Sequence, residues 1–282
     1  MPLDITPLRA WIGRTEAVAD AMAPFQAAAL AATLDRDSAP GAGDPLPPLW
    51  HWCYFQELFK TRELTENGHG RHGGFFPPMP LPRRMFAGAR VAFQRPLVIG
   101  APARRVSAIA DISAKQGASG DLAFLLVRHE FRDAAGTAFV EEQDLVYRAP
   151  PSPGAPTPPA RRASGKAAWE ETFEANEALL FRYSALIFNA HRIHFDRPYV
   201  TEKEGYPGLI VHGQLIATKL AELARRHAGR PMKSFRFRSV SALFDHQRCR
   251  LCGAPDGDAV NLWAEDAQGA LVVEARAELA GR

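Results

Sequence analysis

Three polar side chains in the second half of the chain, Asn189, His191 and His194, lie close enough in sequence to act together. They follow a helical pattern, at a point where the chain should turn into a loop. A second reactive segment lies downstream, where a turn containing Gly208 runs into His212–Gly213. Imidazole exchanges protons near neutral pH, so the histidines are candidates for general acid–base catalysis.

The His212–Gly213 step coincides with the start of the strongest predicted helix, residues 212–227. The first backbone N–H groups of a helix lack partners within the helix and can stabilise negative charge on a ligand. Glycine at this position lets a ligand approach the backbone closely. A loop that supplies a base, together with a helix start that binds an oxyanion, predicts an acid–base site.

The two halves of the chain have similar patterns of helix and strand. In the first half we expect a helix at 25–34 and strands at 49–55, 88–96, 105–112, 123–131 and 138–147. In the second half we expect helices at 176–186 and 212–227 and strands at 234–243, 248–251, 259–264 and 271–279. Asp133–Gly136 and Asp266–Gly269 predict hairpin turns in corresponding places. A helix with an antiparallel sheet, repeated twice, indicates an α+β fold.

Proline separates these halves. Six of the 23 prolines fall between Pro150 and Pro159, and such a run cannot form a helix or a central strand. We therefore predict an N-terminal domain over 1–148, a Pro-rich linker over 149–161 and a C-terminal domain over 162–282.

The composition is typical of a globular protein, with 46% hydrophobic and 23% charged residues. A net charge of +3 is too small and too mixed to indicate nucleic-acid binding. No apolar run approaches the roughly 20 residues of a membrane helix, and the N-terminus has no secretory signal pattern. Because 3 cysteines cannot form a disulfide framework, we expect a reducing, cytoplasmic location.

The histidine motif resembles that of the MaoC-like hydratases and dehydratases, a hotdog-fold family acting on acyl thioesters. The family motif is Asp-x-Asn-Pro-x-His, followed downstream by His-Gly at a central helix. The matching positions in this chain are Asn189, His191, Arg192, His194 and His212–Gly213. This form is similar to the subgroup that includes type 2 3-hydroxyacyl-thioester dehydratases and mesaconyl-CoA and itaconyl-CoA hydratases. Segments 46–52 and 80–88 of the first half also resemble that subgroup.

The resemblance implies a double hotdog, with a degenerate N-terminal half that shapes one active site carried by the C-terminal half. It implies reversible hydration of a 2-enoyl thioester, with His194 as the general base and the Gly213 amide binding the thioester oxygen. Asn189 cannot exchange a proton at neutral pH, so it would position the water. His191 either shares the proton transfer or packs as a structural residue.

The implied substrate is an acyl-CoA or an acyl carrier protein thioester, with a short branched or dicarboxylic acyl group favoured and no cofactor. Arg83 and Arg84 either contact the phosphates of CoA or form a solvated basic surface. Arg192 is the candidate cation for a dicarboxylate. Gly208 and His212 complete the candidate substrate-binding set, although His212 is better explained as bracing the helix start. We also expect a homo-oligomer, with a dimer favoured, because hotdog sheets have exposed edges.

Several other interpretations stay open at this level. The three histidines at 191, 194 and 212 could be metal ligands, but the helix and glycine context is explained without metal. Cys249 and Cys252 are better explained as two strand thiols than as a zinc or redox pair. The Gly-rich segment 68–74 lacks the Gly-Lys-Ser/Thr ending of a phosphate loop and is interpreted as a flexible loop. A thioesterase or a non-catalytic thioester-binding protein would use the same fold.

Overall fold

The computed structural model describes residues 3–117, 120–150 and 159–281. Most of the predicted Pro-rich linker, residues 151–158, lies outside the described residues. The strands of the first half are β1 (Thr15–Asp20), β2 (Arg83–Phe93), β3 (Ala103–Gly117), β4 (Gly120–Asp133) and β5 (Gly136–Arg148). Those of the second half are β6 (Trp169–Glu174), β7 (Met232–Ser239), β8 (Arg248–Asp256), β9 (Ala259–Asp266) and β10 (Leu271–Leu279).

Within these described ranges, three α-helices accompany the strands: α1 (Pro24–Thr33), α2 (Glu177–Leu186) and α3 (Gly213–Ala228). Short 3₁₀ segments occur at η1 (Thr6–Trp11), η2 (Trp50–Cys53), η3 (Thr61–Glu63) and η4 (Arg192–His194). A single π-helical turn, η5, covers Tyr199–Lys203. No helix within the described residues is both long and apolar enough to cross a membrane.

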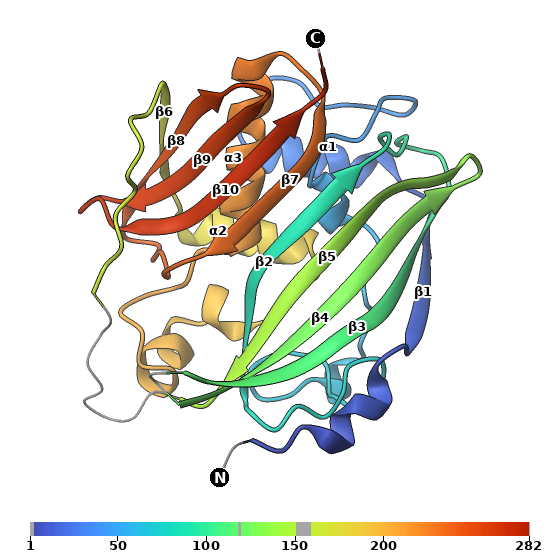
Figure 1. Cartoon of the computed structure of the whole chain (residues 1–282), viewed down its shortest axis with the longest axis vertical. Coiled ribbons are helices and arrows are strands. Elements are labelled where there is room, and N and C mark those ends of the chain that lie inside the picture. Colours follow the sequence, from blue (N-terminus) through green and yellow to red (C-terminus); the bar gives the residue numbers. More distant parts are fainter. Residues whose placement is uncertain (1–2, 118–119, 151–158, 282) are drawn as a thin grey trace.

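All ten strands form one sheet in the order β1-β3-β4-β5-β2-β7-β10-β9-β8-β6 (Figure 1). Counted from its own outer edge, each half contributes its strands in the same relative order, which is the expected result of an internal duplication. The two halves meet where β2 pairs antiparallel with β7, from Gly88 opposite Arg238 to Ala92 opposite Ser234. One hydrophobic core runs through both halves. The fold is thus an α+β double hotdog, as the resemblance implies.

The two Asp-x-x-Gly turns are confirmed as hairpins in equivalent places, between β4 and β5 and between β9 and β10. Asp133 and Asp266 each accept a hydrogen bond from the backbone N–H two residues on, at 2.8 and 2.9 Å. Gly136 and Gly269 have φ values of +99° and +76°, which glycine adopts without steric cost. The same local chemistry therefore closes the same hairpin in both halves.

The predicted helices at 25–34, 176–186 and 212–227 are confirmed as α1, α2 and α3. The strand expected at 49–55 is wrong, because this segment contains the 3₁₀ turn η2. All of its residues are buried, so it has no exposed face of the kind that a half-buried strand requires. The short edge strands β1 and β6 were not expected; each has only six residues and an exposed side.

The halves differ in the segment before the β2–β7 junction. In the second half this segment contains α3, whose apolar face packs against β7, β8, β9 and β10. In the first half, residues 34–82 form only short 3₁₀ turns and loops. The first half therefore has no counterpart of α3, and its loops are free to line a cavity.

Cys249 and Cys252 lie on β8, as the strand interpretation predicts. Both are buried and carry free thiols. Their side chains belong to different apolar clusters, because residues three apart on a strand point to opposite faces of the sheet. They are therefore placed neither to pair with each other nor to share a metal ion.

Gly88 at the β2–β7 junction generates a stability prediction. A Cβ atom at this position would lie 2.2 Å from the carbonyl oxygen of Phe237. We expect Gly88→Val to lower the melting temperature by roughly 5–15 °C, because backbone of one half must move away from the other. Ala92→Val, at an exposed position on the same strand, is the matched control and should change it little. An unchanged melting temperature for Gly88→Val would contradict this account of the junction.

Candidate active site

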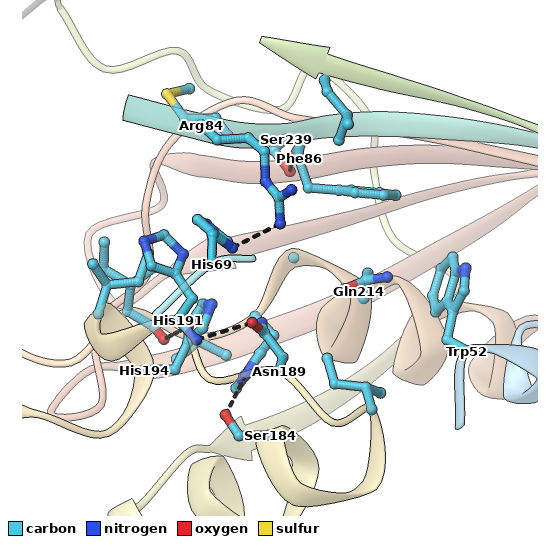
Figure 2. A pocket seen from close by; sticks show the side chains of 18 of the residues that line it. Trp52, His69, Arg84, Phe86, Ser184, Asn189, His191, His194, Gln214 and Ser239 are labelled. Atoms are coloured by element: carbon cyan, nitrogen blue, oxygen red, sulfur yellow. Dashed lines mark hydrogen bonds between the residues drawn. The ribbon is translucent and has the colours of Figure 1, made fainter. Parts of the chain in front are cut away.

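A cavity of about 1050 Å³ is lined by residues of both halves. The second half contributes Asn189, His191, His194, His212 and Gly213, so the structure brings together five of the residues singled out from sequence. The first half contributes side chains from η2, from the loop before β2 and from β2 itself, including Trp52, His69, Arg84 and Phe86 (Figure 2). The cavity is therefore a joint product of the two halves.

The loop that carries the histidine motif begins where α2 ends. Phe188 adopts a left-handed backbone conformation with φ +49°, and the Asn189 N–H donates to the Ser184 carbonyl at 2.8 Å. The Asn189 Oδ1 accepts a hydrogen bond from the His191 backbone N–H at 3.0 Å, closing an Asx turn. Because this oxygen is bound to backbone, the Asn189 amide N–H₂ is the part of the side chain left for a ligand.

His194 has a defined tautomer. Its Nδ1 lies 2.7 Å from the carbonyl oxygen of Ile210, and a carbonyl can only accept, so Nδ1 carries the proton. The Ile210 N–H in turn donates to the Ile193 carbonyl at 2.9 Å, which ties the two loops together. Nε2 is left with its lone pair. Burial lowers the pKa of His194 to about 4, so the ring is a neutral base at physiological pH.

His212 packs directly on His194 and precedes the first turn of α3. The two rings are stacked with centroids 3.6 Å apart, and the Nε2 of His212 is hydrogen-bonded to the Ser184 Oγ at 2.9 Å. His212 therefore links α2, the histidine loop and the start of α3. Gly213 follows it as the first residue of the helix, where the backbone N–H has no partner within the helix.

His191 and His69 extend this pair to a cluster of four imidazoles, with His191 edge-on to His194 and tilted against His69. The ring centroids of His191 and His194 are 5.5 Å apart, and those of His191 and His69 are 4.1 Å apart. Burial above all holds the pKa of His69, His191 and His212 well below 6.5. The next cause is the charge of Arg84 for His69, and the charge that protonation of His194 would create for His191 and His212. All four rings are therefore neutral in the folded protein at neutral pH.

His69 is a site residue that sequence reasoning missed, because segment 68–74 was interpreted only as a flexible loop. The loop is held against the histidine motif by the Arg192 N–H, which donates to the Asn67 carbonyl at 3.0 Å. Gly68 has φ +90°, and a Cβ there would lie 1.7 Å from the Ala190 carbonyl oxygen. Only glycine permits this contact between the halves, and the Gly-His-Gly run at 68–70 is the one signal in the sequence for it.

The side chains of Arg83 and Arg84 do not form a solvated basic surface. The Arg84 Nη2 donates to the His69 Nδ1 at 2.7 Å, and Figure 2 shows the arm reaching from β2 toward the histidines. Arg83 forms an ion pair with Glu204 at 2.8 Å. Both arginines line the cavity, but only Arg84 contacts the histidine cluster.

Two residues predicted to bind substrate are placed elsewhere, and those predictions need correction. Arg192 is ion-paired with Asp196 at 2.8 Å and lies over the Tyr199 ring at 4.1 Å, outside the cavity lining. Gly208 also lies outside the lining, and a Cβ there would meet the Asp245 carboxylate at 2.7 Å. Arg192 and Gly208 therefore shape the loops that hold the site.

A second buried polar group lines the cavity in the first half. Glu141 is fully buried and accepts hydrogen bonds from Trp52 Nε1 at 2.9 Å and from Gln143 at 3.1 Å, while His51 Nε2 lies 2.9 Å away. Burial alone would raise the pKa of Glu141, but the charge and hydrogen bond of His51 outweigh it and hold the pKa at about 2. Trp52 and His51 thus belong to the lining as well as to the core.

The histidines are not arranged as metal ligands. Within the described part of the chain, no group of three His, Cys, Asp or Glu side chains converges on a point that could hold a metal ion. The rings of His194 and His212 stack face to face instead, with 17° between their planes. The arrangement supplies a neutral base, an amide donor and a helix start to one cavity, which suits proton transfer next to a stabilised oxyanion.

Comparison with known proteins finds a matching family model and similar proteins. Residues 49–245 match the family model described as hydroxyacyl-thioester dehydratase type 2. Mesaconyl-C(4)-CoA hydratase of Chloroflexus aurantiacus is 50% identical, over 96% of this chain and 98% of that protein. Hydroxyacyl-thioester dehydratase type 2 of Schizosaccharomyces pombe is 40% identical over 33% of this chain and 31% of its own length.

Solved structures show the same fold at low sequence identity. A MaoC-like dehydratase from Phytophthora capsici superposes with a TM-score of 0.72 at 14% identity, covering 99% of this chain and 98% of that one. A Mycobacterium tuberculosis protein described as a double hotdog gives 0.61 at 11% identity, covering 95% and 96%.

The burial of neutral histidines predicts how stability depends on pH. Below pH 6.5 an unfolded histidine binds a proton, whereas folded His194 does so only near pH 4, so stability falls as the pH drops through this window. For His194 alone, the loss between pH 7 and pH 5 should be roughly 2 kcal/mol of unfolding free energy.

Denaturant unfolding at the two pH values measures this loss. We expect the His194→Gln variant to show a smaller loss than the parent, because Gln does not titrate. His246→Gln, at an exposed histidine, is the matched control and should keep the parent's pH dependence. Equal pH dependence in parent and His194→Gln would contradict the assignment of a neutral His194.

Proposed function

Because this chain belongs to the hydroxyacyl-thioester dehydratase type 2 family of MaoC-like hydro-lyases, we propose that it hydrates mesaconyl-C4-CoA or a closely related dicarboxylic enoyl thioester. The family assignment makes it an enzyme that adds water to, or removes it from, an acyl-CoA thioester. The observation that carries the residue-level proposal is His194, a neutral base held beside the start of α3. The choice of acyl group is supported by the relative with 50% identity that is named for this substrate.

The thioester carbonyl is proposed to bind at the start of α3. The Gly213 N–H has no partner within the helix, and the N-terminal end of the helix dipole favours negative charge there. During hydration, negative charge develops on the carbonyl oxygen as the double bond accepts the nucleophile. A donor held in advance stabilises that charge without a cost of reorganisation in the transition state.

His194 is proposed to act on the water. Its Nε2 lone pair accepts a proton from the water while the water oxygen bonds to Cβ, and the electrons of the C=C bond move to Cα and the thioester oxygen. The proton on Nε2 then passes to Cα, so the net addition is H and OH, and dehydration is the reverse. The Ile210 carbonyl keeps the other proton on Nδ1 throughout and also stabilises the imidazolium that forms.

Asn189 is proposed to hold the attacking water as a hydrogen-bond donor. Its Oδ1 is already bound to the His191 N–H, so the amide N–H₂ donates to the water oxygen and turns the water hydrogens toward a base. The arrangement explains how Asn serves where the family motif has Asp. His191 is proposed to pack between His194 and His69 and so to hold both rings in their orientations.

We also propose that the two halves have different roles. We assign the chemistry to the C-terminal half, 162–282, and the shaping of the substrate site to the N-terminal half, 1–148. Support comes from the cavity lining, in which His69, Arg84 and Trp52 come from the first half and the proposed base from the second. One active site per chain follows from this assignment.

We further propose a cytoplasmic homo-oligomer, with a dimer favoured. The support for the location is that all three cysteines are free thiols. The support for association is that β1 and β6 end the sheet, each with one strand edge that no other strand of the described residues pairs with. Light scattering on the purified protein measures the mass: a dimer is expected, and a monomer at micromolar concentration contradicts it.

Replacing His194 tests the proposed mechanism. We expect His194→Gln to reduce kcat for hydration of mesaconyl-C4-CoA by about 10²–10⁴-fold, the usual contribution of a general base, with little change in KM. The measurement is loss of absorbance at the enoyl thioester band, and crotonyl-CoA should show the same drop.

His246→Gln serves as the matched control, because this histidine is exposed and should leave the rate unchanged. A His194→Gln enzyme that hydrates both thioesters at the parent rate would rule out the proposed base. A parent enzyme that releases free thiol without losing substrate double bond would instead indicate a thioesterase.

A further inference from the structure

We propose that Arg84 binds the free carboxylate of a dicarboxylic acyl thioester and that His69 positions the Arg84 arm for this contact. The inference rests on the proposed function and deepens it by assigning the residue that selects the acyl group. It replaces Arg192, which is engaged by Asp196 and lies outside the cavity lining.

The charge of Arg84 has no carboxylate partner within the described residues. Arg83, Arg105 and Arg161 also line the cavity, and each has an acidic partner at 2.8–3.2 Å. Arg84 lies over the Phe76 ring at 5.7 Å, and its guanidinium donates a hydrogen bond to the neutral imidazole of His69. A partly buried guanidinium without a counter-ion is costly, and a bound carboxylate would supply the missing charge.

The contact with His69 places this cation at the reactive end of the cavity. Arg84 is a donor only, so the His69 Nδ1 must accept, and the ring is held neutral in that tautomer. The His69 ring lies against His191, which in turn lies against the proposed base His194 (Figure 2). Burial is the main cause that lowers the pKa of His69 and of His191, and the nearby charge of Arg84 adds to it.

The chemistry of the proposed substrate requires a cation in this place. In a mesaconyl C4-thioester the carbon that receives the hydroxyl group carries both a methyl group and the free carboxylate. A base that delivers water to that carbon therefore lies close to the carboxylate. The phosphates of CoA, at the far end of the pantetheine arm, are separated from the thioester by many bonds. Arg84 thus fits the carboxylate better than it fits those phosphates.

Arg148 is the other cavity-lining arginine that lacks an acidic partner within the described residues. It is therefore the alternative candidate for binding the substrate carboxylate. It ends β5, opposite Arg83 in the pairing with β2, and its Nε is buried without a hydrogen-bond partner within the described residues. We assign the carboxylate to Arg84 because, of these two arginines, only Arg84 is hydrogen-bonded to the histidine cluster, through His69. Parallel variants at the two positions separate these assignments.

Binding of two saturated thioesters tests the inference without turnover. Succinyl-CoA and butyryl-CoA differ only in having a carboxylate or a methyl group on the β-carbon. We expect the parent to bind succinyl-CoA more tightly, and Arg84→Met to weaken succinyl-CoA roughly 10- to 100-fold while leaving butyryl-CoA unchanged. Isothermal titration calorimetry measures both dissociation constants. If Arg84→Met keeps the parent's ratio of the two dissociation constants, the inference is overturned. It is also overturned if Arg148→Met, and not Arg84→Met, loses the preference for succinyl-CoA.

Turnover of a second matched pair of thioesters tests this inference separately from the proposed function. Mesaconyl-C4-CoA and 3-methylcrotonyl-CoA also differ by a carboxylate against a methyl group. Arg84→Met should lower kcat/KM for the first selectively. A parent that hydrates only the neutral thioester overturns the carboxylate assignment but keeps the hydro-lyase. A parent that hydrates neither, while Arg84→Met alone loses succinyl-CoA binding, overturns the proposed function and keeps the carboxylate site.

Arg90 provides the matched control on the same strand. It lies on β2 at the surface, outside the cavity lining, and is ion-paired with Glu142 at 3.0 Å. Arg90→Met should leave the ratio of the succinyl-CoA and butyryl-CoA dissociation constants at the parent value.

If Arg84→Met does not fold, as judged by circular dichroism, Arg84→Lys replaces it. Lys keeps the charge but loses the planar donor pair, so a partial loss confined to succinyl-CoA is expected, and equal losses for both thioesters overturn the inference.

His69 is tested as a positioning residue. His69→Leu removes the acceptor for Arg84 and should weaken succinyl-CoA binding several-fold without changing butyryl-CoA binding. His69→Asn keeps an acceptor and should restore part of the preference. Equal weakening of both thioesters in His69→Leu, with no rescue by Asn, would indicate a packing role and remove His69 from the proposal.

Discussion

The antiparallel pairing of β2 with β7 is the interaction on which the rest of the structure depends. It joins two similar half-sheets into one, and it brings Arg84 and His69 of the first half next to His191 of the second. Gly88 permits the junction because any side chain there would meet the Phe237 carbonyl. Gly68 then permits the neighbouring loop to contact Ala190 directly. Both contacts involve backbone, so they define the geometry of the cavity more strictly than side-chain packing would.

The cavity is lined by imidazole groups that burial keeps in the neutral form. The four clustered imidazoles are neutral because each is removed from water and because a proton on one would repel a proton on the next. Arg84 supports this by adding a fixed positive charge beside them. A neutral base with a defined tautomer is the form that proton abstraction from water requires. A cation without a counter-ion beside it is the form that recognition of an acyl carboxylate requires.

The two halves share a strand order but differ in the segment that precedes the β2–β7 junction. The strand order and the Asp-x-x-Gly hairpins are retained in both, because they specify the sheet. The long helix before the junction exists only in the second half, where it packs on the sheet and presents Gly213 to the cavity. In the first half, the equivalent stretch is loop and 3₁₀ turn. Those loops supply His69, Trp52 and the buried His51–Glu141 pair to the lining.

The sequence by itself determined the α+β pattern, the equivalent hairpins, the position of α3 and the histidine motif, because these depend on local periodicity, turn chemistry and short spacing. The strand expected at 49–55 was wrong because burial on all sides overrode local preference. Only the tertiary structure decided that His69 and Arg84 join the motif and that Arg192 and Gly208 do not. Residues more than a hundred positions apart meet there through the β2–β7 pairing and the Gly68 contact, and no local pattern encodes such a meeting.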